Sequence, residues 1–124
     1  MKIPNVVTIV ALTASVGLDA CREETVRTAI YSSVNISVLG DSLTDYYTIR
    51  VPNSDTIHYG NARRDNTTSY VVLDDSYQSA LANSQDRFRF VGEINNAVVV
   101  DEEYVIKADE CHISKVSGKE EVQL

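Results

Sequence analysis

Short segments in which apolar and polar residues alternate, each followed by turn-forming residues, are the feature that most limits how this chain can fold. In one segment Val34, Ile36 and Val38 alternate with serine and asparagine, which gives a strand one apolar face and one polar face. Clusters of Gly, Pro, Asn, Asp and Ser separate such segments. The pattern predicts roughly seven or eight short strands, at residues 33–38, 46–51, 69–73, 87–91, 97–100, 104–108, 112–116 and 121–124.

Helical patterns are scarce in the sequence. Only residues 76–82 could form a helix, of about two turns. Many short strands and one short helix predict an all-β fold, in which a single domain forms a sandwich of two antiparallel sheets. The polar loop at residues 55–68 is predicted to be the most mobile region.

The first 21 residues have the layout of a bacterial lipoprotein signal. Lys2 precedes an apolar run at residues 6–18 that is too short to span a bilayer, and Ala20 stands directly before Cys21. The layout predicts a protein that is secreted across the inner membrane and lipid-anchored through Cys21 in the cell envelope, at the outer membrane. The membrane is then a partner through the lipid.

This reading divides the chain into three parts. Residues 1–20 would be removed as the signal, residues 21–28 would form a polar tether, and residues 29–124 would form the sandwich domain. In one alternative, residues 6–10 are a core strand of a cytosolic domain, because Val, Ile and Thr favour strands. In another, the protein is a cytosolic β-domain subunit whose residues 1–20 form a partner-binding strand.

The chain is acidic, with 18 Asp and Glu against 11 Lys and Arg and a formal net charge of −7 at pH 7. Such a chain repels phosphate backbones, and it has no basic cluster larger than Arg63-Arg64. The composition therefore argues against nucleic acid as a partner. The charge is better suited to keeping an exposed protein soluble.

The two cysteines, Cys21 and Cys111, allow two exclusive states. A disulfide between them would close a loop of about 90 residues, which the chain-entropy model values at about 4–5 kcal/mol. A cysteine that is acylated on its sulfur cannot also form that disulfide. We expect the lipid at Cys21 with Cys111 reduced and shielded, and the Cys21–Cys111 disulfide is the alternative.

No metal or other cofactor is expected. Two histidines and one further cysteine make a thin ligand set, and Cys111 and His112, being adjacent, would point to opposite faces of a strand. The acidic runs at residues 74–75 and 101–103 lack the spaced oxygens of a calcium loop. Such runs are expected to be solvated turns.

The stretch Gly40-Asp41-Ser42-Leu43, after a predicted strand, resembles the nucleophile block of the GDSL esterases. That resemblance implies Ser42 as the nucleophile, His112 as its base and Asp109 as the group that orients the imidazole. Those enzymes are α/β folds with a helix after the serine, whereas residues 46–51 read as a strand. The segment between Ser42 and Asp109 is also too short for parallel strands with crossover helices. A small secreted esterase is therefore the alternative function.

Two segments resemble the bacterial carboxypeptidase regulatory-like domains, which have a transthyretin-like β-sandwich. Residues 28–38 are similar to the opening strand of that family, and residues 104–113, with Asp109-Glu110-Cys111-His112-Ile113, are similar to its late strand. The family cysteine usually pairs with one at the start of the first strand, and Arg27 occupies that position here. The resemblance implies a non-catalytic module without active-site residues.

Taken together, the sequence predicts a non-catalytic binding or accessory module of the cell envelope, with a protein or glycan ligand at the exposed loops. The alternation also predicts which residues form the core. They are Val34, Ile36, Val38, Phe88, Phe90, Val98, Val100, Tyr104 and Ile106, with Ser33, Asn35, Arg87 and Arg89 exposed.

Overall fold

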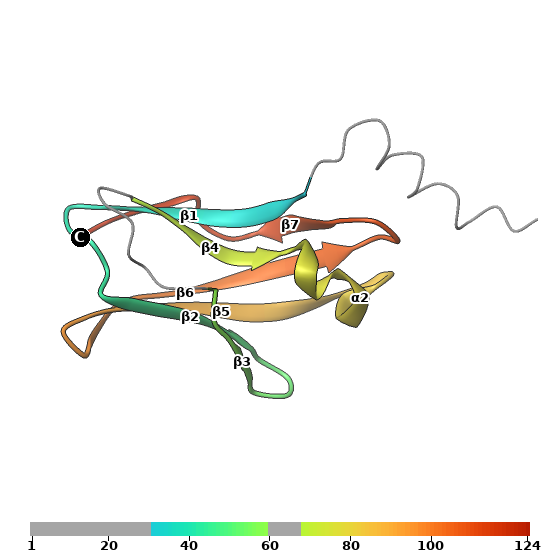
Figure 1. The fold of residues 1–124 in the computed structure, drawn as a ribbon, viewed down its shortest axis with the longest axis horizontal. Coiled ribbons are helices and arrows are strands. Elements are labelled where there is room, and N and C mark those ends of the chain that lie inside the picture. Colours follow the sequence, from blue (N-terminus) through green and yellow to red (C-terminus); the bar gives the residue numbers. More distant parts are fainter. Residues whose placement is uncertain (1–30, 60–67) are drawn as a thin grey trace, which may run out of the picture.

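The computed structural model describes residues 31–59 and 68–124, which form a sandwich of two β-sheets (Figure 1). The predicted signal and tether, and the centre of the predicted mobile loop, lie outside the described residues. The elements in chain order are β1 (Ser33–Leu39), β2 (Asp45–Arg50), β3 (Asp55–Ile57), β4 (Ser69–Asp74), the 3-10 helix η1 (Asp75–Tyr77), α2 (Gln78–Leu81), β5 (Ser84–Ile94), β6 (Ala97–Ala108), β7 (Ile113–Ser117) and β8 (Glu121–Gln123).

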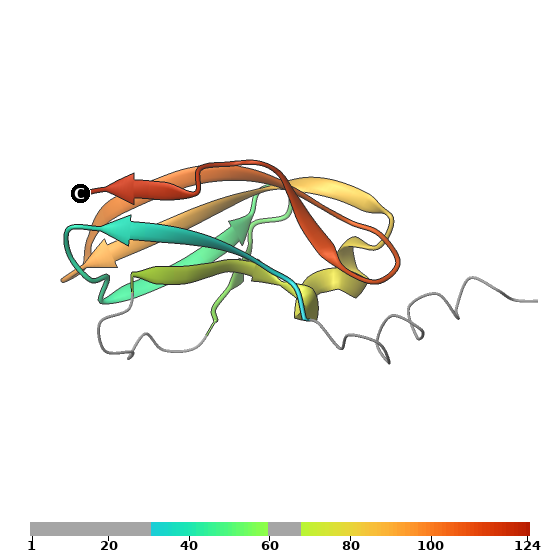
Figure 2. The same cartoon turned by 90° about the horizontal axis from the view of Figure 1, so that it is seen from above.

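The strands form a three-stranded sheet in the order β4-β1-β8 and a five-stranded sheet in the order β3-β2-β5-β6-β7 (Figures 1 and 2). Neighbouring strands are antiparallel except β1 and β8, which run parallel. The predicted all-β sandwich is confirmed, and the predicted helical segment forms η1 and α2 at one end of it. The short strand β3 was not predicted, because it lies inside the segment expected to be a loop.

The core lies between the two sheets and consists of the inward-facing residues of the strands. Ile36 and Val38 of β1 and Phe88 and Phe90 of β5 have no exposed surface. The predicted core residues are buried with one exception, and the four residues predicted to be exposed are exposed. The core cluster contains Val34, Ile36, Val38, Leu43, Tyr46, Tyr70, Val72, Leu73, Leu81, Phe88, Phe90, Val100, Tyr104, Ile106, Ala108 and Ile113.

Val98 is the exception, because its side chain is 55% exposed. The pairing of β5 with β6 shifts between Gly92 and Glu93, so that Glu93 pairs with Val98 while Gly92 pairs with Val100. A bulge of this kind changes which side chains face the core. Val100, on the far side of the bulge, is buried as predicted.

The acidic run at residues 101–103 does not form a turn, as had been expected, but lies in the middle of β6. The two strands predicted at 97–100 and 104–108 are therefore one continuous strand. Arg89 of β5 makes a bidentate ion pair with Asp101, with nitrogen–oxygen distances of 2.8 and 3.1 Å. Opposite charges on neighbouring strands stabilise their pairing, which explains how an acidic run is accommodated in a sheet.

The C-terminal segment crosses from the five-stranded sheet, where β7 is an edge strand, to the three-stranded sheet, where β8 lies beside β1 (Figure 2). Gly118, in this crossing, has a φ of +136°, and a Cβ atom there would lie 2.1 Å from ring carbon Cδ2 of Tyr104. Only glycine fits both conditions without strain. The Tyr104 hydroxyl also donates a hydrogen bond of 2.5 Å to the carbonyl oxygen of Lys119. The crossing is thus fixed against the core.

Candidate functional site

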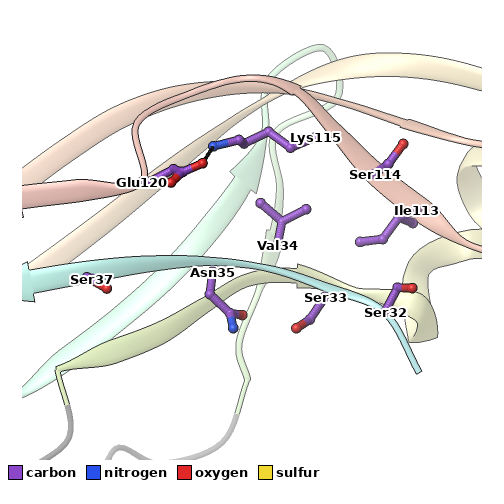
Figure 3. A pocket seen from close by; sticks show the side chains of 9 residues that line it. All are labelled: Ser32, Ser33, Val34, Asn35, Ser37, Ile113, Ser114, Lys115 and Glu120. Atoms are coloured by element: carbon purple, nitrogen blue, oxygen red, sulfur yellow. Dashed lines mark hydrogen bonds and ion pairs between the residues drawn. The ribbon is translucent and has the colours of Figure 1, made fainter. Parts of the chain in front are cut away.

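A groove between β1 and β7 is the candidate site, and we call it the β1–β7 slot (Figure 3). Its volume is about 520 Å³, which lies within the usual range of ligand-binding clefts. The slot opens on one side of the sandwich, between β1 of the three-stranded sheet and β7, an edge strand of the five-stranded sheet. It is lined by Ser32, Ser33, Val34, Asn35, Ser37, Ile113, Ser114, Lys115 and Glu120.

One wall of the slot is the edge of β1. The opposite edge of β1 pairs with β4, but β8 covers the slot-facing edge only from Ser37 to Leu39. The backbone N–H of Ser37 donates to the Glu120 carbonyl oxygen at 2.9 Å on this side. Because backbone groups alternate in direction along a strand, those of Ser33 and Asn35 face the slot. No strand pairs with this part of β1 among the described residues.

The other wall is β7, whose only strand neighbour among residues 31–59 and 68–124 is β6. Figure 3 shows Val34 and Ile113 facing each other across the slot. Both side chains are buried, and they form its apolar floor. Two strand edges from different sheets thus face each other over a narrow apolar base.

The polar lining of the slot is close to neutral. Serine hydroxyls and the Asn35 amide supply most of the polar groups. The Lys115 ammonium donates to the Gly118 carbonyl oxygen at 2.9 Å, and it lies 3.4 Å from a carboxylate oxygen of Glu120. The one positive and one negative charge of the lining are therefore paired with each other.

One end of the slot is closed by a junction around the Asp75 carboxylate, which we call the Asp75 junction. Its oxygens accept hydrogen bonds from the backbone N–H groups of Ser32 at 2.8 Å and Ile113 at 2.9 Å. The Nδ1 atom of His112 lies 2.7 Å from the same carboxylate. The junction joins the start of β1 to η1 and the start of β7. Sequence reasoning missed this role, since it treated Asp75 as part of a solvated turn.

The surroundings of Asp75 change its acidity in two opposing ways. Burial raises the pKa of this carboxyl group, but the hydrogen bonds from His112, Ser32 and Ile113 outweigh burial and hold the pKa below its usual value. A lowered carboxyl pKa in the folded state stabilises the fold above the unfolded-state pKa, and this stabilisation is lost as the pH falls through the folded-state pKa.

We expect Asp75→Asn to lower the free energy of unfolding at neutral pH by about 1.5–3 kcal/mol, because hydrogen bonds to a charged acceptor are replaced by weaker ones. The difference from the parent should be complete above about pH 4, the pKa of an Asp carboxyl group in the unfolded chain. It should shrink as the pH falls from there through the lowered folded-state pKa of Asp75. Urea unfolding across this pH range measures both effects. Asp55→Asn, at an exposed carboxylate, is the matched control. A difference that stays constant down to low pH would contradict the role of the charge.

The structure does not bring the predicted esterase residues together. Ser42 is exposed in the turn that follows β1, whereas His112 belongs to the Asp75 junction at the beginning of β1. The seven residues of β1 separate the two places by roughly 20 Å at about 3.3 Å per residue. The Asp109 carboxylate accepts hydrogen bonds from the backbone N–H groups of Cys111 and His112, with nitrogen–oxygen distances of 2.7 and 2.8 Å. It therefore shapes the β6–β7 turn.

We accordingly expect no ester hydrolysis that depends on Ser42. Purified Ser42→Ala protein and the parent should both hydrolyse short-chain esters at the background rate, because His112, the base that the resemblance implies, lies at the other end of β1 from Ser42. A serine-directed phosphonate gives an independent measurement by intact mass. Stoichiometric labelling of Ser42 in the parent would overturn this expectation.

Cys111 is disulfide-bonded in the structure, so the expectation that it stays reduced is wrong there. Cys21, the predicted lipid attachment site and the other cysteine of the chain, lies outside the described residues. Cys111 precedes His112 directly, so the disulfide lies beside the Asp75 junction.

Two further features concern metals and membranes. Within residues 31–59 and 68–124, no group of three or more His, Cys, Asp or Glu side chains is placed to hold a metal ion. The part of the chain that the structure describes also has no helix long and apolar enough to cross a bilayer.

Comparison with known proteins identifies no relative: no family model, no curated protein and no solved structure matches this chain.

Proposed function

We propose that this protein is a non-catalytic binding or accessory module that works outside the cytoplasm, in the cell envelope. The observation that carries the proposal is the β1–β7 slot, a groove of ligand-binding size lined by hydroxyl, amide and backbone groups. The lining contains serine hydroxyls, but the Lys115 and Glu120 side chains lie against each other. The nearby His112 is engaged with Asp75. Recognition therefore fits the slot better than a reaction does.

The arrangement of the ends of the sandwich suits a tethered module. The described chain begins at the end that carries α2, and the C-terminus and the β5–β6 turn lie at the opposite end (Figures 1 and 2). A tether on the N-terminal side would place the α2 end toward a membrane. The far loops, and the open side of the slot, would then be accessible to a protein or glycan ligand.

The state of the cysteines bears on the compartment. Disulfides persist in secreted and envelope proteins and are rare in a reducing cytosol, so the bonded Cys111 supports export. Within one chain, that bond would need Cys21, which would leave no thiol for a lipid. A lipid on the sulfur of Cys21 and a disulfide at Cys21 exclude each other, so the state of this cysteine distinguishes an anchored exported form from one that is not anchored.

The resemblance to the carboxypeptidase regulatory-like domains adds a proposal about ancestry. A β-sandwich is the fold that this resemblance implies, and such domains are binding or structural modules rather than enzymes. We propose on this basis that the late segment ending in Asp109-Glu110-Cys111-His112-Ile113 corresponds to the late strand of that family.

We expect the protein from its native cells to be in the envelope or secreted fraction and to lack residues 1–20, because the leader has the layout of a cleaved signal. Cell fractionation followed by intact-mass measurement tests this. A lipid adduct on Cys21 would assign the anchored form. A chain without adduct and without free thiols would assign the bridged form. A reduced protein in the cytosol that retains its leader would contradict the proposal.

A further inference from the structure

We propose that the β1–β7 slot binds an extended polypeptide strand that pairs with the edge of β1 left uncovered by the described strands, is uncharged inside the slot and carries basic residues on either side. This inference rests on the proposed function, because it names the ligand class of the binding module.

The backbone geometry of β1 is the first argument. From Ser33 to Ser37 the slot-facing edge has a length of about four residues, or roughly 13 Å, and β8 begins to pair with the same edge at Ser37. An added strand would therefore continue the row that β8 occupies, and Ser33 and Asn35 would supply the backbone donors and acceptors. Strand addition to an exposed sheet edge is a common mode of peptide recognition.

The shape of the slot selects a single strand. The Asp75 junction closes one end, and Glu120, hydrogen-bonded through its carbonyl oxygen to Ser37, closes the other. Val34 and Ile113 form the floor. A strand in this position would place every second side chain on that apolar floor, so β-branched residues would fit there. The intervening side chains would point outward.

The charged groups in and around the slot indicate which residues the ligand should carry inside it and on either side of it. Inside the slot the Lys115 and Glu120 charges are paired, so an uncharged segment meets no unpaired charge there. At one end the Glu120 side chain is 84% exposed, so its carboxylate can contact a second cation besides Lys115, and at the other end Asp109 is exposed. Basic residues beyond each end of the segment would complement these carboxylates. A second copy of the chain, with a net charge of −7, is disfavoured as the donor.

The test is a titration of the isotope-labelled full chain with a capped peptide of alternating Thr and Val that has one Arg at each end. We expect saturable chemical-shift changes and increased hydrogen-exchange protection at the amides of Ser33 and Asn35. A peptide with the same side chains but N-methylated at alternate residues should bind about tenfold more weakly, as expected from the loss of one or two backbone hydrogen bonds. A peptide with Glu in place of Arg should also bind more weakly.

Two variants at one position test the backbone role. Asn35→Pro removes the N–H group that faces the slot and places a ring there, whereas the bonds of β1 to β4 are made by the alternate residues. We expect this variant to lose peptide binding and Asn35→Ala to retain it. Circular dichroism and the melting temperature show whether each variant is folded. If Asn35→Pro does not fold, the comparison of the two peptides on the parent decides the question.

Three results would overturn the proposal: no change at Ser33 and Asn35 up to millimolar peptide, equal binding of the N-methylated peptide, or shifts confined to another edge such as β3. Binding of a neutral oligosaccharide in the slot, with no binding of the peptide, would also overturn it. In that case the protein would remain an exported binding module with a different ligand, whereas a cytosolic location would remove the proposed function itself.

Discussion

We expect the substitution Phe90→Ala to lower the free energy of unfolding by about 3–5 kcal/mol, the usual cost of truncating a buried phenylalanine. Phe90 has no exposed surface, and its ring lies 5.9 Å from the ring of Tyr46, centroid to centroid. It contributes to the layer between the sheets near the middle of β5. The loss is a large part of the about 5–15 kcal/mol that holds a typical domain folded.

Thermal and urea unfolding measure this effect, and we expect the melting temperature to fall by at least about 12 °C. Arg89→Ala is the matched control. Arg89 directly precedes Phe90 in the same strand but points outward, where it makes an exposed ion pair with Asp101. Exposed pairs contribute at most about 1 kcal/mol. If Arg89→Ala proved more damaging than Phe90→Ala, the register of β5 would be wrong.

The strands could be predicted from the sequence because each alternating segment carries its own evidence. Val34, Ile36 and Val38 lie on one face whatever their neighbours are, since side chains alternate along any strand. Val98 could not be placed in this way. Its exposure depends on a bulge opposite Gly92, and a bulge is a property of two strands together.

The partners of the side chains in the Asp75 junction could not be predicted from the sequence either. The sequence places Asp109 three residues before His112, and this local spacing suggested that the two side chains interact. In the fold, His112 contacts Asp75, which is 37 residues away, and Asp109 binds backbone N–H groups of its own turn. Local spacing cannot reveal a partner that the packing of two sheets brings close.

The β1–β7 slot was not predicted for a related reason. It exists because β8 covers only part of β1, and because the chain leaves the five-stranded sheet at Gly118. Residues 112–116 and 121–124 were both identified as strands, but nothing in either segment indicates which sheet it joins. The glycine between them was a visible signal of a turn, and its role in sheet crossing appears only in three dimensions.

The crossing at Gly118 leads to the second large effect. We expect Gly118→Ala to lower the free energy of unfolding by about 2–5 kcal/mol, because it combines backbone strain with steric overlap. A φ of +136° is unfavourable for any residue with a Cβ atom, and this Cβ atom would lie 2.1 to 2.7 Å from three carbons of the Tyr104 ring. Tyr104 is fully buried, so its ring has no free space to move into.

Gly40→Ala separates the two causes, since Gly40 also has a positive φ, +112°, but a Cβ atom there would be no closer than 3.2 Å to its neighbours. We expect Gly40→Ala to show mainly the strain, about 1–3 kcal/mol, because Leu124 and Gln123 need to shift by only a few tenths of an ångström. Gly118→Ala should exceed it in urea unfolding. Because the Gly118 carbonyl oxygen also accepts the hydrogen bond from Lys115, a displaced crossing should alter the slot as well. Shifts of the Ser33 and Asn35 amides in Gly118→Ala, absent in Gly40→Ala, would show that the crossing determines the shape of the slot. Equal losses of stability in the two variants would instead mean that the segment relaxes away from Tyr104, and that the ring does not fix the path of the chain.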